Sequence, residues 1–432
     1  MAGPDAGRAE RTDGPEHYRL IVVGAGFAGA SAVRDLRSDG FAPDETLLID
    51  AFSQYTYRPL IHEVASGSLS PKSVLSRNAA LCRGRARFLQ AHVAELSPKL
   101  RRLRTGDGAQ FSYDYLVLAT GASPARPPEE FAGHFQLFWS LDDALKLRSE
   151  LARVWEAATA PEGLVDKADS TVAIVGGGTT GVELACEVGA LFRELRRRSG
   201  PARRPASGRP RVVLLEGSER LMGWLDPYFH RTALRRLGEL GVEVRLSALV
   251  EEAGPAEVVL PDGPLAARTK VWAAGLAVGG LASGLPGERD SSGRLRVTRH
   301  LTVPDHPEIY VIGDASVHED RRHGPLPPTA SVAVQQGPFV ARDLARRAAG
   351  RRERPGYEHF DRGYVVGLGP GDAVAEALGR KFSGRAAHAL YRSVLLFYLR
   401  GRERRALALA DWSLGRLGRL GFRGQSSVIR GS

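Results

Sequence analysis

The chain has 432 residues, of which 43% are hydrophobic and 25% are charged, and its formal net charge is +11. This composition is typical of a globular chain with more than one domain and excludes collagen-like and low-complexity proteins. The 2 cysteines, Cys82 and Cys186, exclude a disulfide framework and an iron–sulfur cluster and favour a reducing, cytoplasmic setting. The histidines lack ligand spacing, so we assign no metal site.

The N-terminal segment, residues 1–17, carries scattered acidic residues and no apolar run. This pattern predicts disorder and argues against a secretory signal. No stretch of the sequence reaches the roughly 18 consecutive apolar residues that a membrane-spanning helix requires.

The first recognisable unit has a strand–helix–strand pattern. Residues 18–23 indicate a buried parallel strand, residues 24–29 read Gly-Ala-Gly-Phe-Ala-Gly, residues 30–36 have helical composition, and residues 46–50 indicate a strand ending in Asp50. In such a unit the three glycines allow a tight turn, the approach of a pyrophosphate and close packing of helix on strand. The helix N-terminus then faces the phosphates and the acid accepts ribose hydroxyls. The sequence therefore predicts a dinucleotide site.

The same pattern returns later in the chain. Residues 171–175 indicate a strand, residues 176–181 read Gly-Gly-Gly-Thr-Thr-Gly, residues 182–198 are helical in composition, and residues 211–215 indicate a strand followed by Glu216. An acid at this position accepts ribose hydroxyls and repels a 2′-phosphate. We therefore expect a second nucleotide site, with a preference for NADH over NADPH.

Two further strands extend the repeat. Residues 115–121 and 270–275 are both apolar and end in glycine, and each lies at nearly the same distance from its own glycine motif. Another strand, residues 309–315, contains Asp314. We predict an α/β chain with two Rossmann-like domains.

This organisation resembles the flavoprotein reductases with two dinucleotide-binding domains. The resemblance implies that the strand at residues 309–315 returns the chain to the first domain, so that the FAD domain is discontinuous and the NADH domain is inserted into it. It also implies FAD at residues 24–29, NAD(P)H at residues 176–181, and a hydrogen bond that Asp314 accepts from the ribityl chain of FAD. Disulfide reductases of this architecture need a cysteine pair in the helix at residues 30–36, and sulfide:quinone reductases need a cysteine late in the chain. Neither is present, so the flavin would pass electrons directly to an acceptor.

Three segments resemble the type II, non-proton-pumping NADH:quinone oxidoreductases. They are residues 57–67, residues 271–275, and residues 328–337, the last of which aligns with the quinone-site helix and its AQxxxQ pattern. Ser331 replaces the first glutamine of that pattern and Gln335 keeps the second. The resemblance implies that Gln335 contacts a quinone carbonyl and that Ser331 is a shorter hydrogen-bonding partner. A surface or capping role for Gln335 is the structural alternative.

The implied activity is FAD-dependent NADH:quinone oxidoreduction, with a hydride passing from NADH to flavin N5 and two electrons then passing to menaquinone or ubiquinone. Glu183 is implied to bind the carboxamide of NADH or to relay a proton, although a glutamate in a first helical turn also has a structural explanation. For FAD the resemblance implies Gly24, Gly26, Phe27, Ala28, Gly29, Asp50, Val93, Thr120, Gly121, Gly313, Asp314, Ala333 and Val334. For NADH it implies Gly176, Gly178, Thr180, Gly181, Glu183, Glu216, Ala274 and Gly275.

The C-terminal region is basic and contains two expected helices, residues 386–399 and 403–420. At 100° per residue, one face of the second helix carries leucines and alanine and another carries Trp and Arg. This pattern is typical of a helix lying on an anionic membrane, so we expect a peripheral protein on the cytoplasmic face of the cell membrane. A dimerisation helix pair and a cover for the flavin domain are alternatives, and nucleic acid is disfavoured because the aromatic residues are not interleaved with the basic ones. The apolar set is Leu407, Ala410, Leu414 and Leu417, and the other set is Arg405, Trp412, Arg416 and Arg419.

The expected domains are a disordered segment (1–17), an FAD domain in two parts (18–150 and 291–383), an NADH domain (165–290) and the membrane-association region (384–432). Two other functions fit the same motifs. One is a soluble NADH reductase that serves a protein acceptor such as a ferredoxin. The other is a non-catalytic flavoprotein that senses NADH.

Overall fold

The computed structural model describes residues 15–36, 40–160, 166–199, 209–351 and 353–418, and the chain forms two compact units. The first unit comprises Met1–Tyr55, Arg77–Ser123 and Ala277–Phe360, and the second comprises Thr56–Ser76, Pro124–Leu276 and Asp361–Ser432. These units divide the chain at other points than the expected domains. In particular, residues 56–76 and the described C-terminal residues 361–418 belong to the same unit as the second glycine motif.

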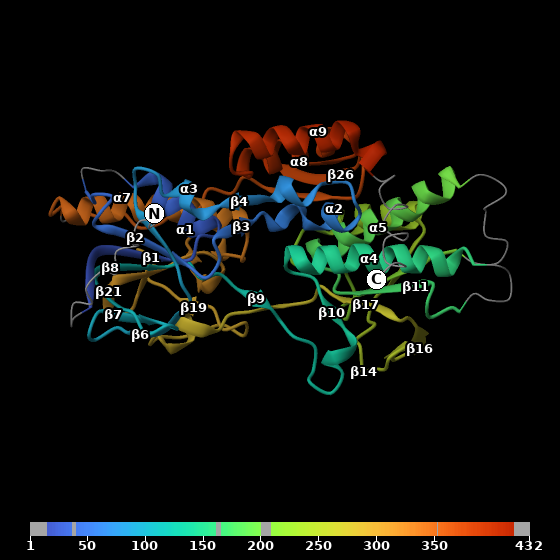
Figure 1. Cartoon of the computed structure of the whole chain (residues 1–432), viewed down its shortest axis with the longest axis horizontal. Helices are drawn as coiled ribbons and strands as arrows, with labels where there is room; N and C mark the ends of the chain where they lie inside the picture. Colours follow the sequence, from blue (N-terminus) through green and yellow to red (C-terminus); the bar gives the residue numbers. More distant parts are fainter. Residues whose placement is uncertain (1–14, 37–39, 161–165, 200–208, 352, 419–432) are drawn as a thin grey trace, which may run out of the picture. The chain divides into compact units, whose positions relative to one another are not determined.

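The first unit is built on an eight-stranded sheet (Figure 1). Its central strand β1 runs parallel to β2 and β8, and β21 continues the parallel order beyond β8. β1 begins at Glu16 and already pairs with β8 there, so the expected disorder of residues 1–17 is wrong at its last two residues, and residues 1–14 lie outside the described part of the chain. The strands, in sheet order, are β20 (Thr302–Val303), β21 (His306–Val311), β8 (Gln110–Leu118), β1 (Glu16–Val23), β2 (Thr46–Asp50) and β5 (Arg87–Gln90). In addition, β7 (Arg102–Thr105) pairs with β8, and β6 (Val93–Ser97) pairs with β7.

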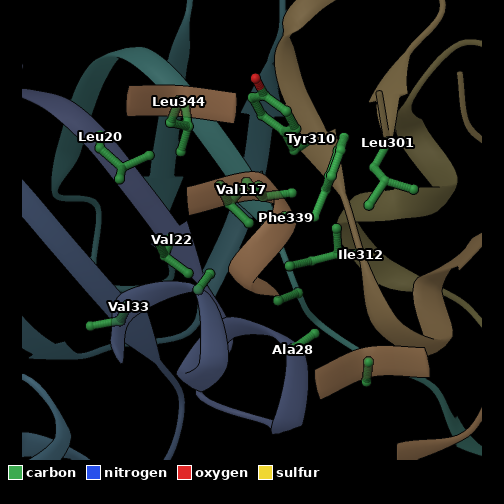
Figure 2. Packing of buried hydrophobic residues seen from close by; sticks show 14 of the residues in the cluster. Leu20, Val22, Ala28, Val33, Val117, Leu301, Tyr310, Ile312, Phe339 and Leu344 are labelled. Carbon is green, nitrogen blue, oxygen red and sulfur yellow. The ribbon is translucent and has the colours of Figure 1, made fainter. Parts of the chain in front are cut away.

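Two helices, α1 (Phe27–Asp35) and α7 (Ala330–Ala348), pack against each other on this sheet. A Cβ atom at Gly337 of α7 would lie 2.6 Å from the carbonyl oxygen of Ala28, so a glycine is needed for the close approach of the two helices. Figure 2 shows the core beneath them, where Val22 and Val117 of the sheet lie near Phe339 of α7. The short helix α3 (Asn78–Leu81) also contacts α1.

The second unit contains a five-stranded parallel sheet whose strands β17, β11 and β12 are almost wholly buried. The predicted α/β fold with two parallel Rossmann-like sheets is therefore confirmed. The sheet order is β10 (Gln136–Leu137), β17 (Thr269–Trp272), β11 (Thr171–Val175), β12 (Arg211–Leu215) and β13 (Val242–Arg245), with helices α4 (Leu141–Ala158), α5 (Thr179–Arg198) and α6 (Pro227–Leu240) and an antiparallel ribbon of β14 (Glu252–Ala253), β15 (Glu257–Leu260) and β16 (Gly263–Ala266).

The C-terminal region adds a small antiparallel sheet and two helices to this unit. Its elements are β25 (Tyr364–Gly367), β26 (Ala373–Ala377), β27 (Arg380–Ser383), α8 (Arg385–Tyr398) and α9 (Arg402–Gly418). The two expected helices are thus confirmed, although residues 419 and 420 lie outside the described part. Helix α8 packs on β26, and α9 contacts the turn η2 (Pro71–Val74), which follows the short helix α2 (Ile61–Ala65) (Figure 1). Among the described residues, no helix has the length and apolar character needed to cross a membrane.

Candidate functional site

The glycine motif of the first unit forms the turn between β1 and α1. Gly24 has φ +103°, and a Cβ atom there would lie 2.3 Å from the carbonyl oxygen of Ala119. A Cβ atom at Gly29 would lie 1.9 Å from the oxygen of Gly24, whereas no described atom lies within 4 Å of one at Gly26. The first and third glycines are therefore fixed by the fold, while the second leaves open space at the start of the helix.

The motif of the second unit repeats this geometry between β11 and α5. Gly176 has φ +113°, and a Cβ atom there would lie 2.9 Å from the backbone of Ala273. A Cβ atom at Gly181 would lie 1.8 Å from the oxygen of Gly176, and one at Gly178 would meet no described atom within 4 Å. Two separate stretches of sequence thus build the same cradle.

In each unit, an acidic residue at the end of the second strand accepts hydrogen bonds from backbone amides of the neighbouring loops. The amide of Ala25 donates to Oδ2 of Asp50 at 2.6 Å, and the amide two residues after Asp50 donates to Oδ1 at 2.8 Å. In the second unit the amide of Gly177 donates to Oε2 of Glu216 at 2.6 Å, and the amide two residues after Glu216 donates to Oε1 at 2.8 Å. Oε1 of Glu216 also accepts from the hydroxyl of Ser218 at 2.6 Å. A carboxylate oxygen can accept two hydrogen bonds, so Oε2 of Glu216 and the carboxylate of Asp50 can hold their loops and still accept a ribose hydroxyl.

The helices that follow the two glycine motifs begin without a side-chain cap, as α8 also does after Gly384. Helices α4, α6 and α7 begin with side-chain caps from Ser140, Asp226 and Thr329. Helices α1 and α5 begin after Gly26 and Gly178, and within the described residues neither has a side-chain cap or an acidic residue in its first turn. An uncapped helix N-terminus beside a glycine cradle suits a pyrophosphate group, so both sites fit a dinucleotide.

A third loop of the first unit carries Asp314. The amide of Gly313 donates to Oε1 of Gln336 at 2.6 Å, and Gln336 is 1% exposed. Gly313 has φ +71°, and a Cβ atom there would lie 3.1 Å from the Cβ atom of Ala28. Gln336 thus fixes the backbone that presents Asp314, which is half-buried. Gln335 and Gln336 are adjacent in the sequence, and no sequence pattern predicted that Gln336 would be the buried one.

Gln335 holds a neighbouring segment in place. Its Nε2 donates to the carbonyl oxygens of Ser331 and Phe360, both at 3.1 Å, and its Oε1 accepts from the amide of Phe360 at 3.1 Å. The hydroxyl of Ser331 is 3.5 Å from the same Nε2. Both N–H groups of the Gln335 amide are therefore used, and donation to a quinone carbonyl would require one of these bonds to be exchanged.

The remaining predicted residues lie at the carboxyl ends of strands, in the core of the first unit, or on helices. Thr120 and Gly121 follow β8, and Ala274 and Gly275 follow β17, at the carboxyl ends of parallel strands beside each glycine loop. The buried members pack in the core of the first unit. They are Ala28, Val93 and Ala333. Phe27 and Val334 are half-buried, and Thr180 is exposed in the first turn of α5.

Glu183 lies on α5 and joins a polar network inside the second unit. Its Oε1 accepts from the amide of Gly367 at 3.1 Å, and its carboxyl group shares a hydrogen bond with the hydroxyl of Tyr391. Burial raises the pKa of Glu183, although the nearby His62 and these two hydrogen bonds oppose the rise. The carboxyl group of Glu183 is therefore suited to carry a proton at a pH where an exposed glutamate would be ionised.

The network continues from Tyr391 to the C-terminal helices. The hydroxyl of Tyr391 is 3.3 Å from Nε2 of His62, and this nitrogen is 4.0 Å from Oε1 of Glu63. Glu63 is 1% exposed, forms an ion pair with Arg392, and accepts a hydrogen bond from the indole of Trp412 at 2.8 Å. Arg392 lies over the Trp412 ring, 4.1 Å from its centroid. The sequence analysis missed these partners, because the pairs are separated by 329 to 349 positions.

The orientation of α9 corrects one expectation. The sequence pattern groups Trp412 with Arg405 beside the apolar face of a helix expected to lie on a membrane, whereas in the structure the Trp412 indole donates to Glu63. The neighbouring Asp411 accepts hydrogen bonds from Ser70 and Ser73 at 2.9 and 2.6 Å. The guanidinium of Arg405 donates to the last carbonyls of α8. Leu414 is exposed, Leu407 is half-buried and Ala410 is exposed. The side chains of Arg416, Leu417 and Arg419 lie outside the described part.

Comparisons with known proteins agree on one family. Residues 18–337 match the family model described as pyridine nucleotide-disulphide oxidoreductase. The chain is 28% identical over 426 residues to the type II NADH:quinone oxidoreductase Ndh of Mycobacterium tuberculosis, which covers 93% of this chain and 88% of that protein. It is 26% identical over 386 residues to the type II NADH:quinone oxidoreductase of Staphylococcus haemolyticus, with 86% of this chain and 92% of that protein covered.

Two solved structures resemble the fold. NDH2 from Plasmodium falciparum in complex with NADH has a TM-score of 0.80 at 17% identity and covers 92% of this chain and 98% of that chain. The sulfide:quinone oxidoreductase from Aquifex aeolicus has a TM-score of 0.68 at 16% identity and covers 96% and 94%. At such identities the likeness concerns the fold alone.

Proposed function

The chain belongs to the pyridine nucleotide-disulphide oxidoreductase family, and from this premise we propose that it is a type II NADH:quinone oxidoreductase. The observation that carries the proposal is the likeness to curated type II enzymes over 93% of the chain. The absence of a cysteine after Cys186 agrees with direct transfer of electrons to the acceptor rather than through a disulfide.

FAD is the proposed resident cofactor, and it fits the cradle of the first unit. The open space at Gly26 and the uncapped start of α1 suit its pyrophosphate, and Asp50 and Asp314 suit its ribose and ribityl hydroxyls. When bound, FAD supplies a flavin that accepts a hydride from NADH and passes two electrons to a quinone. The protein supplies binding, orientation and proton transfer.

NADH is proposed for the second cradle. The open space at Gly178 suits its pyrophosphate, and Glu216 accepts the adenosine ribose hydroxyls with the lone pairs that its loop leaves. The same carboxylate repels a 2′-phosphate. Glu183 is proposed to carry a proton for quinone reduction, and Ser331 and Gln335 are proposed to contact the quinone.

Anaerobic stopped-flow mixing tests the function. NADH should bleach the flavin absorbance rapidly and NADPH at least about tenfold more slowly, because a 2′-phosphate meets Glu216. A menaquinone or ubiquinone analogue should then reoxidise the flavin. Rapid reduction followed by very slow reoxidation with every quinone would contradict the proposal and favour a protein acceptor or an NADH sensor. Equal rates with NADH and NADPH would contradict the role of Glu216.

We also propose that the protein docks on an anionic membrane at the cytoplasmic face through α9. Trp412 faces inward, and the outward side carries Leu409 and Leu414, which are 49% and 58% exposed. Basic residues precede them at Arg402 and Arg404. A few buried leucines and basic side chains are sufficient for reversible, salt-sensitive attachment.

Replacing both leucines by serine should weaken liposome binding at least about tenfold, because a buried leucine contributes about 1.5–3 kcal/mol. Co-sedimentation with vesicles containing phosphatidylglycerol measures the change. Leu378→Ser is the matched control, since Leu378 is 85% exposed in the same unit but lies between β26 and β27. Equal binding by the double variant and the native protein would show that α9 is not the anchor.

A further inference from the structure

The turn at residues 217–225, which follows β12 in the second unit, packs against the glycine motif. Its residues Leu221 and Met222 are 0% and 2% exposed. The amide of Met222 donates to the carbonyl oxygen of Gly177 at 2.8 Å, and a Cβ atom at Gly177 would lie 2.6 Å from Cδ2 of Leu221. The amide of Gly177 donates to Glu216 at 2.6 Å. The loop that leads to the proposed pyrophosphate site is therefore held in place by this turn.

A histidine on α6 accepts a hydrogen bond from the backbone of the turn. The amide of Leu221 donates to Nδ1 of His230 at 3.0 Å. The next residue, Met222, has φ +49°, a left-handed conformation that is uncommon for a residue with a side chain. All of these residues belong to the second unit. The bond to His230 therefore helps to hold a backbone conformation that is not intrinsically favoured.

Only one form of the imidazole ring can make this bond. Nδ1 accepts a hydrogen bond when the ring is neutral and carries its proton on Nε2, whereas both nitrogens are donors in the protonated ring. Protonation of His230 would therefore set an N–H group of the ring against the amide N–H of Leu221. The turn would then have to move away from the ring.

We propose that His230 is a positioning residue for the nucleotide site and makes nucleotide binding sensitive to pH, an inference that rests on the proposed function. The neutral ring keeps Leu221 and Met222 against Gly177, so the loop stays in the form that receives the pyrophosphate. Reversible uptake of one proton at Nδ1 breaks the bond to Leu221 and weakens nucleotide binding. By linkage, a bound nucleotide in turn favours the neutral ring.

The charges near the ring set the pH range of the effect. Burial lowers the pKa of His230, and the positive charges of Arg220 on the turn and Arg231 on α6 lower it further. Nucleotide affinity should therefore be fully present at a pH above the ordinary histidine pKa of about 6.5. It should fall as the pH decreases through the lower pKa of His230, because the protonated ring then predominates.

The other charged groups of the surrounding elements have partners or are exposed. Helix α6 packs on α5, β13 and β26. Glu219 of the turn and Arg235 of α6 are exposed, and Glu376 of β26 lies opposite Lys381 in the sheet register. The ion pairs are Asp226 with Lys381, Arg236 with Glu239 and Asp372, Glu243 with Arg211 and Arg245, and Glu194 with Arg197 and Arg198.

A pH series of nucleotide binding tests the proposal. Isothermal titration of the full-length, FAD-loaded protein with NAD⁺, which does not reduce the flavin, measures the dissociation constant between about pH 5 and pH 8. The dissociation constant should be constant above about pH 7 and should rise about fivefold or more towards pH 5. Flavin absorbance and tryptophan fluorescence verify that the protein stays folded over this range. A dissociation constant that does not change with pH overturns the proposal.

Two substitutions at His230 separate the hydrogen-bond acceptor from the titration. In His230→Asn the side-chain oxygen takes the place of Nδ1 and does not titrate, so NAD⁺ should bind with nearly native affinity at neutral pH and with little pH dependence. In His230→Leu the acceptor is lost, so the dissociation constant should be about fivefold higher at neutral pH and above. An undiminished pH dependence in either variant, or native affinity in His230→Leu, overturns the proposal.

Arg231→Gln moves the titration while it keeps the acceptor. Because Arg231 lowers the pKa of His230, its removal should move the midpoint of the pH dependence upward. His134→Asn is the matched control, since His134 is an exposed histidine of the same unit in the turn η3 (Ala132–His134) and its loss should leave the midpoint in place. A lowered midpoint in Arg231→Gln, or an equal shift in His134→Asn, overturns the assignment to His230.

A second measurement distinguishes failure of this inference from failure of the proposed function. A native protein that binds NAD⁺ at no pH refutes the proposed nucleotide site. The amide signal of Leu221 in nuclear magnetic resonance spectra then still tests the contact, because it should shift with the same midpoint as the His230 ring. An amide signal that does not follow the ring overturns the role of His230 in holding the turn.

Discussion

Replacing Arg392 by leucine is expected to lower the free energy of unfolding by about 3–5 kcal/mol. The side chain of Glu63 is 1% exposed and that of Arg392 is 18% exposed, so the substitution leaves a buried carboxylate without its cation. It also removes the cation–π contact between Arg392 and Trp412, at 4.1 Å. Chemical denaturation followed by tryptophan fluorescence measures the change.

Two further variants isolate the buried pair. The double variant Glu63→Gln/Arg392→Leu should recover part of the loss, because no unpaired charge is then buried. Arg104→Leu is the matched control, since its partner Glu95 is 61% exposed and exposed pairs contribute about 0–1 kcal/mol. Similar losses from Arg392→Leu and Arg104→Leu would contradict a buried ion pair at Glu63.

The same contacts change how a shortened chain should be interpreted. A protein ending at Gly401 would lose Trp412, which donates to Glu63, and Asp411, which accepts from Ser73 at 2.6 Å. Such a truncation removes internal partners of the second unit as well as the outward face of α9. Substitutions at Leu409 and Leu414 separate membrane attachment from stability, because both side chains are exposed.

The nucleotide cradles could be predicted because their determinants are local. Glycine adopts a backbone with φ near +100° at Gly24 and Gly176 with little steric cost, and the acids Asp50 and Glu216 each stand at or directly after the end of a continuous apolar strand. The two copies of the motif lie at nearly equal distances from the later strands that end in Gly121 and Gly275. This repeat predicted a fold with two domains. These signals need no knowledge of distant contacts.

The polar network could not be predicted for the opposite reason. Glu63 and Trp412 are 349 positions apart, and nothing local shows that a buried carboxylate on one helix needs an indole on another. The leucine pattern of α9 assigned an apolar face, yet the structure buries Ala408 and turns Trp412 inward. The apolar residues of α9 are compatible with more than one orientation of the helix. The hydrogen bond from Trp412 to Glu63 selects the orientation that is observed.

In the nucleotide cradle, Gly178→Ala is expected to raise the dissociation constant for NADH at least about tenfold while the protein keeps its FAD and its stability. Gly178 has φ −69° in an extended conformation and no described atom within 4 Å of a Cβ atom, so alanine should change the free energy of unfolding by less than about 0.5 kcal/mol. The new methyl group instead occupies the space through which a pyrophosphate approaches the backbone. Isothermal titration with NAD⁺, which carries the same pyrophosphate and does not reduce the flavin, measures the change in nucleotide affinity, and the flavin absorbance measures retained FAD.

Gly181→Ala gives the contrast that makes this result specific. A Cβ atom at Gly181 would lie 1.8 Å from the oxygen of Gly176. Because this contact overpacks and strains the turn, the variant should lose about 3 kcal/mol or more of its free energy of unfolding. Gly238→Ala, on α6 with no described atom near the added methyl group, should change neither property. If Gly178→Ala bound NADH normally, the open space beside the start of α5 would not be the pyrophosphate site, because a group held there cannot share its volume with a methyl.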